Sequence, residues 1–214
     1  MRYTYIEIMS KRGKKHAGSC SASCRGRRYC RDACAVCAVC CSNYCVERVR
    51  CSFNGGVYRR WRTYTQKLPW LVCRIDGEVV GYGYAAPHRT RAAYQWSVET
   101  SIYVAQEQHR HGIAGAIYAA LFELLAMQGY YNIYVGITSP NERSMKFHKA
   151  MGFIISGAYQ ESMYKFGQWR DVLWMGKSLR PHDGAPQPTV PFPEIKDSPL
   201  VTRALNQAVE KIHL

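Results

Sequence analysis

The chain has 214 residues, of which 47% are hydrophobic and 21% charged, and its formal net charge is +14. These values are ordinary for a globular protein with room for one well-buried α/β domain. Apolar runs stay shorter than the roughly 18 residues of a membrane-spanning helix, and the N-terminal stretch lacks the apolar core of a signal peptide, so we expect a cytoplasmic protein without a membrane partner.

Basic residues and cysteines are concentrated near the N-terminus. Residues 1–62 contain 14 of the 29 Lys and Arg residues but only three of the 15 acidic residues. Nine of the ten cysteines lie between Cys20 and Cys51. The C-x-x-C spacings there share Cys37 and are not followed by a second separated pair or by paired histidines. We therefore predict neither a metal site nor a disulfide framework.

The first elements in chain order are weakly specified. Tyr3–Met9 alternates and predicts a strand, and the basic stretch that follows is typical of a loop. Apolar residues recur at helical spacing over Asp32–Glu47, with Asp32 as a candidate N-cap. Two explanations stay open for residues 10–60: a basic, Cys-rich insertion, or a shifted reading frame that has degraded the start of the fold.

From Trp70 onward the pattern is consistent, and it predicts an α/β fold. Helices are expected at 112–128 and 141–151, and strands at 70–75, 78–86, 95–105, 131–137, 153–159 and 164–177. After Pro181 the chain is Pro-rich, and residues 199–214 predict a short amphipathic helix. The expected organisation is an atypical segment over 1–60, a core over 61–180 and a tail over 181–214.

Residues 96–120 carry the strongest functional signal. They predict a strand, a polar loop with small residues and then a helix, and Glu99 lies on the strand. Free N–H groups and the helix dipole favour anions at such a helix N-terminus. A phosphate site with one carboxylate beside it indicates an enzyme that holds a phosphorylated cofactor and moves a proton.

This segment resembles the core of the GNAT acetyltransferases, and within them the phosphinothricin N-acetyltransferase family. The family's cofactor signature falls on His109–Ala114, where Gly112 and Ala114 match and His109 replaces the usual Gln or Arg. The resemblance covers about 61–179 and includes the blocks "PWLV", "DGEVVGYGYAAPHRTRAAYQWSVE", "GITSPNERSMKFHKAMGF" and "YKFGQWRDV".

The resemblance implies a GNAT (acyl-CoA N-acyltransferase) fold, with a central mixed, mostly antiparallel sheet flanked by helices. It implies an N-acetyltransferase that uses acetyl-CoA as cosubstrate and acts on a small amino-acid-like amine. Phosphinothricin, methionine sulfoximine and methionine sulfone are the implied substrates, with direct transfer in a ternary complex. It also implies a homodimer.

The resemblance also assigns residues to the site. Glu99 would be the catalytic base, and His148 would orient a water or the departing thiol. The cofactor would contact the main chain of Ile102, Tyr103 and Val104, the loop His109, Arg110, His111, Gly112, Ile113 and Ala114, and Asn141. The substrate would contact Arg89, Thr90, Arg91, Tyr94, Thr100 and Ser101.

Plainer interpretations stand beside these assignments. Asn141 is equally consistent with a helix cap, His148 with a packed residue, and the exposed arginines with solvated surface. Two other functions also stay open: an inactive protein that still binds CoA, and a nucleic-acid-binding module in residues 1–60. The basic segment has the charge for phosphate contacts but no recognised nucleic-acid-binding motif, so nucleic acid is not the expected partner.

Overall fold

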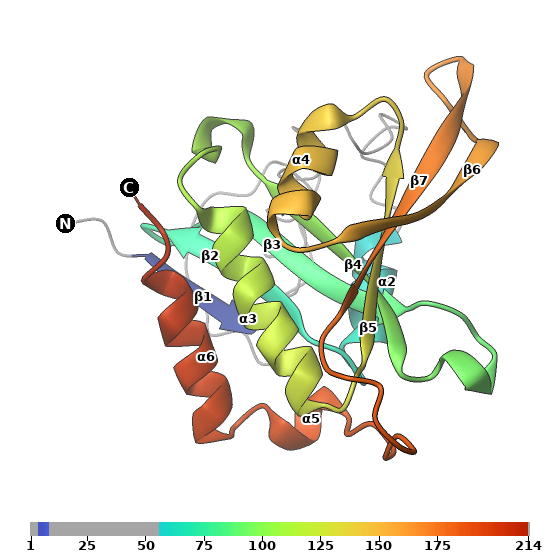
Figure 1. Ribbon diagram of the computed structural model, residues 1–214. Helices are drawn as coiled ribbons and strands as arrows, with labels where there is room; N and C mark the ends of the chain where they lie inside the picture. Colours follow the sequence, from blue (N-terminus) through green and yellow to red (C-terminus); the bar gives the residue numbers. More distant parts are fainter. Residues whose placement is uncertain (1–3, 9–55, 214) are drawn as a thin grey trace.

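A seven-stranded sheet organises the chain (Figure 1), and the computed structural model describes residues 4–8 and 56–213. The strand order is β1-β2-β3-β4-β5-β7-β6, and the pairs are antiparallel except for the parallel β4–β5 pair. This confirms the mixed, mostly antiparallel sheet. The strands are β1 (Thr4–Ile8), β2 (Trp70–Ile75), β3 (Glu78–Pro87), β4 (Ser97–Val104), β5 (Asn132–Thr138), β6 (Ile154–Lys165) and β7 (Gln168–Ser178).

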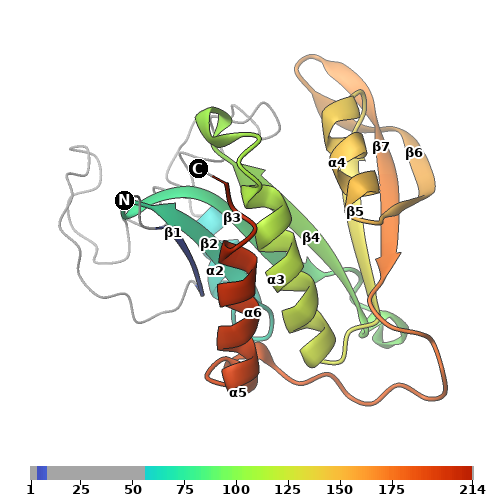
Figure 2. The same cartoon turned by 60° about the vertical axis from the view of Figure 1, so that its left-hand side comes forward.

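Helices cover both faces of the sheet (Figures 1 and 2). α3, α4 and α6 lie on one face and α2 lies on the other. In the described part of the chain, no helix combines the length and apolarity needed to cross a bilayer. The helices are α2 (Gly56–Tyr64), α3 (Ile113–Met127), α4 (Glu142–Ala150), α5 (Phe192–Ile195) and α6 (Pro199–Val209), with short 3-10 turns η2 (Ala92–Tyr94) and η3 (Gln106–Gln108).

The larger core lies between the sheet and α3. Ile117, Leu121 and Leu124 of α3 are fully buried, and burial of each such side chain contributes about 1.5–3 kcal/mol. Cys73 on β2 belongs to the same core, and burial raises the pKa of its thiol to about 12. This thiol is therefore a packing group and not a reactive one.

A second cluster packs on the opposite face, beneath α2. Trp61 of α2 belongs to this cluster with stacked aromatic rings on β2 and β3, in which Trp70 and Tyr84 have centroids 4.1 Å apart. Since strand residues alternate between faces, this cluster and the α3 core share the same strands. Packing on both faces holds the sheet in one orientation relative to the helices. It therefore also determines the face to which each β4 side chain points.

Most predicted elements are confirmed, and one is wrong. Observed and expected bounds agree within a few residues for the strands β1–β5 and for the helices α3 and α4. The helix α6 begins at the expected residue and ends at Val209, before the expected end. The strand expected over 164–177 is instead broken by a turn at Phe166 and Gly167, whose φ values of 53° and 75° are left-handed. Two such residues form the tight turns that join hairpin strands. The expected helix over 32–47 and the clustered cysteines lie outside the described residues.

Candidate active site

The strands β4 and β5 separate in the middle of the sheet. Their register has three Cα pairs and ends at Glu99 opposite Tyr134, although β4 continues to Val104 and β5 to Thr138. Figure 2 shows β5, β7 and β6 leaning away from β1–β4 beyond this point. Glu99 therefore lies where the strands part, and the main chain of Ile102–Val104 borders the opening.

The loop before α3 is shaped by left-handed residues. Arg110 has φ 71°, and Gly112, the N-cap of α3, has φ 79°. Among the described residues, no side chain caps the first-turn N–H groups of this 15-residue helix, so the helix end can receive an anion. His109 Nε2 lies 3.0 Å from the Val104 carbonyl oxygen, and an N–H donated there ties the loop to the end of β4.

The charge state of His109 is set by its surroundings. Burial lowers the pKa of its imidazole, and the positive charge of Arg143 on α4 lowers that pKa further. The charge of Arg143 on the neighbouring helix thus disfavours the protonated form of His109. Buried polar atoms of this loop region, Gln108 Oε1 and His111 Nδ1, have no hydrogen-bond partner among the described residues. N–H groups, cations and unsatisfied polar atoms together fit a polar, phosphorylated cofactor.

The segment after α6 packs against this loop. The His213 N–H donates to the His111 carbonyl oxygen over 3.0 Å. A Cβ built on Gly112 would overlap the Lys211 carbonyl oxygen. Two features therefore require glycine at position 112: its left-handed φ and this close backbone approach.

Glu99 is held by a histidine that the sequence interpretation did not select. His88 Nδ1 lies 3.0 Å from Glu99 Oε1, and the two side chains are 10% and 36% exposed, respectively. The His88 ring stacks on Tyr134 at 4.4 Å and meets Tyr94 and Trp174 edge-on. The carboxylate is thus partly open, fixed in orientation and bordered by aromatic rings.

His148 lies in a different, closed environment. It is 3% exposed, with Nδ1 2.8 Å from the Ser144 carbonyl oxygen and Nε2 3.1 Å from the Tyr118 hydroxyl. Thr100 Oγ1 donates to the same hydroxyl over 3.4 Å. Burial lowers the pKa of the His148 imidazole, so Nδ1–H donates and Nε2 accepts. Thr100 and Glu99 are neighbours on β4 and point to opposite faces, so the structure does not bring Thr100 and His148 to Glu99.

The residues expected at the substrate lie partly around Glu99. Tyr94 contacts the His88 ring, and Arg89 donates to the Tyr159 hydroxyl over 2.8 Å. Thr90 and Arg91 are exposed in the same loop, and Ser101 follows on β4. This side of the sheet therefore gathers a carboxylate from β4, cations from the loop between β3 and β4, and aromatic rings from that loop and from β5, β6 and β7.

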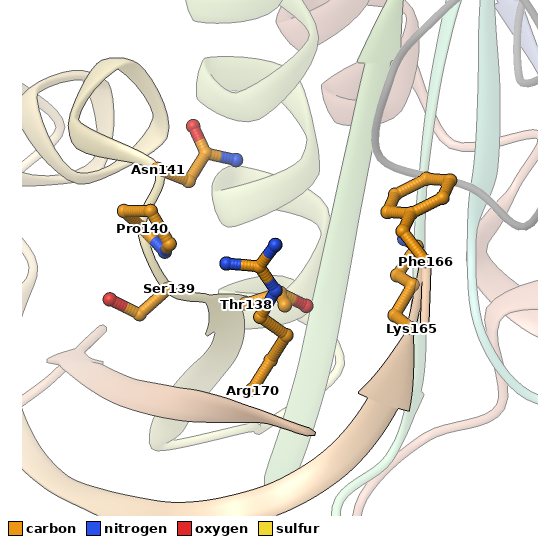
Figure 3. A pocket seen from close by; sticks show the side chains of 7 residues that line it. All are labelled: Thr138, Ser139, Pro140, Asn141, Lys165, Phe166 and Arg170. Carbon is orange, nitrogen blue, oxygen red and sulfur yellow. The ribbon is translucent and has the colours of Figure 1, made fainter. Parts of the chain in front are cut away.

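Asn141 caps α4 and also borders a pocket. Its side chain accepts from the Ser144 N–H over 3.1 Å, which confirms the cap interpretation. The pocket has a volume of about 300 Å³ and lies between the start of α4 and the β6–β7 hairpin (Figure 3). Its lining consists of Thr138, Ser139, Pro140, Asn141, Lys165, Phe166 and Arg170.

Comparisons with known proteins identify the family to which this fold belongs. A family model described as "Acetyltransferase (GNAT) domain" matches residues 58–174. The chain belongs to this family of acetyltransferases.

Named relatives are similar over the same region. The chain is 41% identical over 131 residues to a phosphinothricin N-acetyltransferase from Streptomyces coelicolor, a match that covers 55% of this chain and 77% of the relative. It is 34% identical over 122 residues to an L-methionine sulfoximine/L-methionine sulfone acetyltransferase from Pseudomonas aeruginosa, with 56% and 71% covered. The crystal structure of a phosphinothricin acetyltransferase from Sinorhizobium meliloti in complex with AcCoA superposes with a TM-score of 0.58 and 30% identity, covering 62% of this chain and 74% of that one.

Proposed function

We propose that this acetyltransferase transfers the acetyl group of acetyl-CoA to the amine of a small amino-acid-like substrate, with Glu99 as the base. Phosphinothricin, methionine sulfoximine and methionine sulfone are the candidate substrates. The observation that carries the proposal is the position of Glu99, a half-exposed carboxylate at the point where β4 and β5 part. The similarity to relatives with those names supports the substrate class.

The cofactor would bind in the opening between β4 and β5 and on the loop before α3. The N–H groups of Gly112, Ile113 and Ala114 and the charge of Arg110 would hold the diphosphate, with His109 and His111 shaping the loop. The main chain of Ile102–Val104 would hold the acyl arm, and Asn141 would contact it from α4. Acetyl-CoA, when bound, supplies the acetyl group as a thioester.

Glu99 and His88 supply the proposed proton transfer. An α-amine is mostly protonated at neutral pH, and it attacks only after losing that proton. Glu99 would take the proton directly or through a water. The hydrogen bond to His88 orients the carboxylate, because the His88 ring is itself fixed by three aromatic neighbours. We assign His88 a positioning role.

His148 has a supporting role in this proposal. Its hydrogen bond with the Tyr118 hydroxyl joins α4 to α3, and its bond to the Ser144 carbonyl, within α4, holds the ring in place. The contact with Tyr118 would fix the spacing of the two helices that enclose the cofactor. Arg89, Arg91 and Tyr94, with Thr90 and Ser101, would form the wall that receives the substrate's carboxylate.

Mass spectrometry of the amines tests the proposal directly. Purified, reduced protein is incubated with acetyl-CoA and with phosphinothricin, methionine sulfoximine, methionine sulfone or glutamate. We expect a product heavier by one acetyl group with at least one of the first three. Acetyl-CoA binding without any such product would identify the inactive CoA-binding alternative.

A further inference from the structure

We propose that Arg170 forms an anion subsite for a second acidic group at the far end of the amine substrate, such as the phosphinate of phosphinothricin. The inference rests on the proposed function and names the substrate class more closely. Arg170 lines the pocket shown in Figure 3.

Two residues of the pocket, Thr138 and Arg170, share a face of the sheet with the Glu99–His88 pair. Tyr134 and Trp174, which contact the His88 ring, belong to that face. Thr138 follows Tyr134 by four residues on β5, and Arg170 precedes Trp174 by four residues on β7. Strand side chains alternate with a period of two, so Thr138 and Arg170 share the face of Glu99.

A glycine occupies the position on β5 between Tyr134 and Thr138. Gly136 is exposed on β5, opposite Trp174. A Cβ there would lie 3.3 Å from Val172 Cγ1 and 3.4 Å from the Trp174 ring. Any side chain at position 136 would crowd these neighbours. Glycine adds no side chain at this position between Tyr134 and Thr138.

The pocket is suited to an anion. None of its seven lining residues is acidic, and two of them, Lys165 and Arg170, are basic. Arg170 is half-buried, and its guanidinium makes no hydrogen bond or ion pair with the residues that the structure describes. Figure 3 shows this guanidinium between the Ser139–Asn141 loop and the Lys165–Phe166 turn. Its planar fork matches carboxylate or phosphinate oxygens.

The separation between Glu99 and Arg170 along the strands decides which acidic group of the substrate Arg170 can bind. Four residues of strand correspond to about 13 Å, so an α-carboxylate beside an amine at Glu99 stays near the Arg89–Arg91 loop. A group at the other end of the substrate reaches toward Arg170. Phosphinothricin carries an anion at that end, whereas methionine sulfone is neutral there. A phosphate of acetyl-CoA is also an anion and could bind Arg170 in the same way. The experiment must therefore distinguish this phosphate from the phosphinate of the substrate.

Steady-state kinetics with both amines tests the subsite. We compare the wild type with Arg170→Gln, Arg170→Lys and the control Lys196→Gln, which removes a partly exposed lysine after α5 that pairs with Asp197. Arg170→Gln should raise KM for phosphinothricin about tenfold or more with little change in kcat, because a charge-assisted bidentate contact is lost. It should change KM for methionine sulfone by less than about twofold, with Arg170→Lys intermediate. The Kd of acetyl-CoA, measured by calorimetry, should equal that of the wild type.

Equal KM increases for both amines, or none for phosphinothricin, would overturn the proposal. Weaker acetyl-CoA binding with an unchanged KM for phosphinothricin would assign the anion to the cofactor and overturn it as well. If the wild type acetylates neither amine, the proposed function fails, and calorimetry with phosphinothricin in the presence of CoA decides the subsite. A Kd that rises in Arg170→Gln but not in Lys196→Gln supports the subsite, and unchanged or undetectable binding rejects it.

Discussion

His148 makes the stability of the protein depend on pH. Burial lowers the pKa of its imidazole, whereas an unfolded chain has a His pKa of about 6.5. Below that pH the unfolded state binds a proton that the folded state refuses, so the free energy of unfolding falls as the pH falls. We expect a lower urea midpoint at pH 5.5 than at pH 7.5, and a smaller difference in His148→Gln. Part of the slope should remain, because the pKa of His109 is lowered too. Equal slopes in both proteins would contradict this account.

The sequence allowed Glu99 to be selected as a candidate site residue, but not His88, its hydrogen-bond partner. Glu99 could be selected because it lies on a strand before a helix that suits an anion. His88 could not, because its contact with Glu99 depends on how β3 pairs with β4, which places Ala86 opposite Glu99. The separation of Thr100 and His148 from Glu99 follows from strand alternation. The sequence shows that alternation but not which face the cofactor or substrate uses.

At the scale of elements, the segment after α6 packs on the loop before α3, which we propose to hold the cofactor. Its contacts are the His213–His111 hydrogen bond and the approach of the Lys211 carbonyl to Gly112. Deleting residues 211–214 should weaken acetyl-CoA binding roughly three- to tenfold in calorimetry, as expected for the loss of one or two such contacts. Lys211→Ala keeps the backbone and should bind like the wild type. Unchanged affinity in the deletion would show that the loop holds its shape alone.

Element boundaries were predictable where periodicity and caps agreed. α3 and β2 follow from their apolar pattern, and α4 from Asn141 and Gly152 at its ends. The hairpin between β6 and β7 was misplaced because its turn, Phe166–Gly167, has only one residue that typically marks a turn. Phe166 is forced into a left-handed conformation by strand pairing on both sides, and its own preference gives no sign of this.

At the scale of the whole molecule, the β6–β7 hairpin exposes an apolar surface. β6 is the outer strand of the sheet. Seven of the ten large hydrophobic residues exposed in the described part of the chain lie between positions 154 and 169. An apolar edge strand pairs readily with its own copy about a two-fold axis. We therefore propose a homodimer through this hairpin.

Light scattering after size exclusion tests that proposal. Ile154 is 72% exposed, and Ile154→Lys would place a charge at the expected interface, converting a dimer into a monomer with little loss of fold. The control Leu200→Lys changes a 56% exposed residue on α6 and should remain dimeric. A monomeric wild type, or a dimer in Ile154→Lys, would reject the hairpin interface.

The measurement that tests the whole account most directly is the turnover of Glu99→Gln beside its affinity for acetyl-CoA. The account predicts a loss in kcat of about a hundredfold or more, as expected for removal of a general base, with an unchanged Kd for acetyl-CoA in calorimetry. The exposed helical variant Glu123→Gln should match the wild type in both. Wild-type turnover in Glu99→Gln would contradict the account, because the carboxylate where β4 and β5 part would then not be the base.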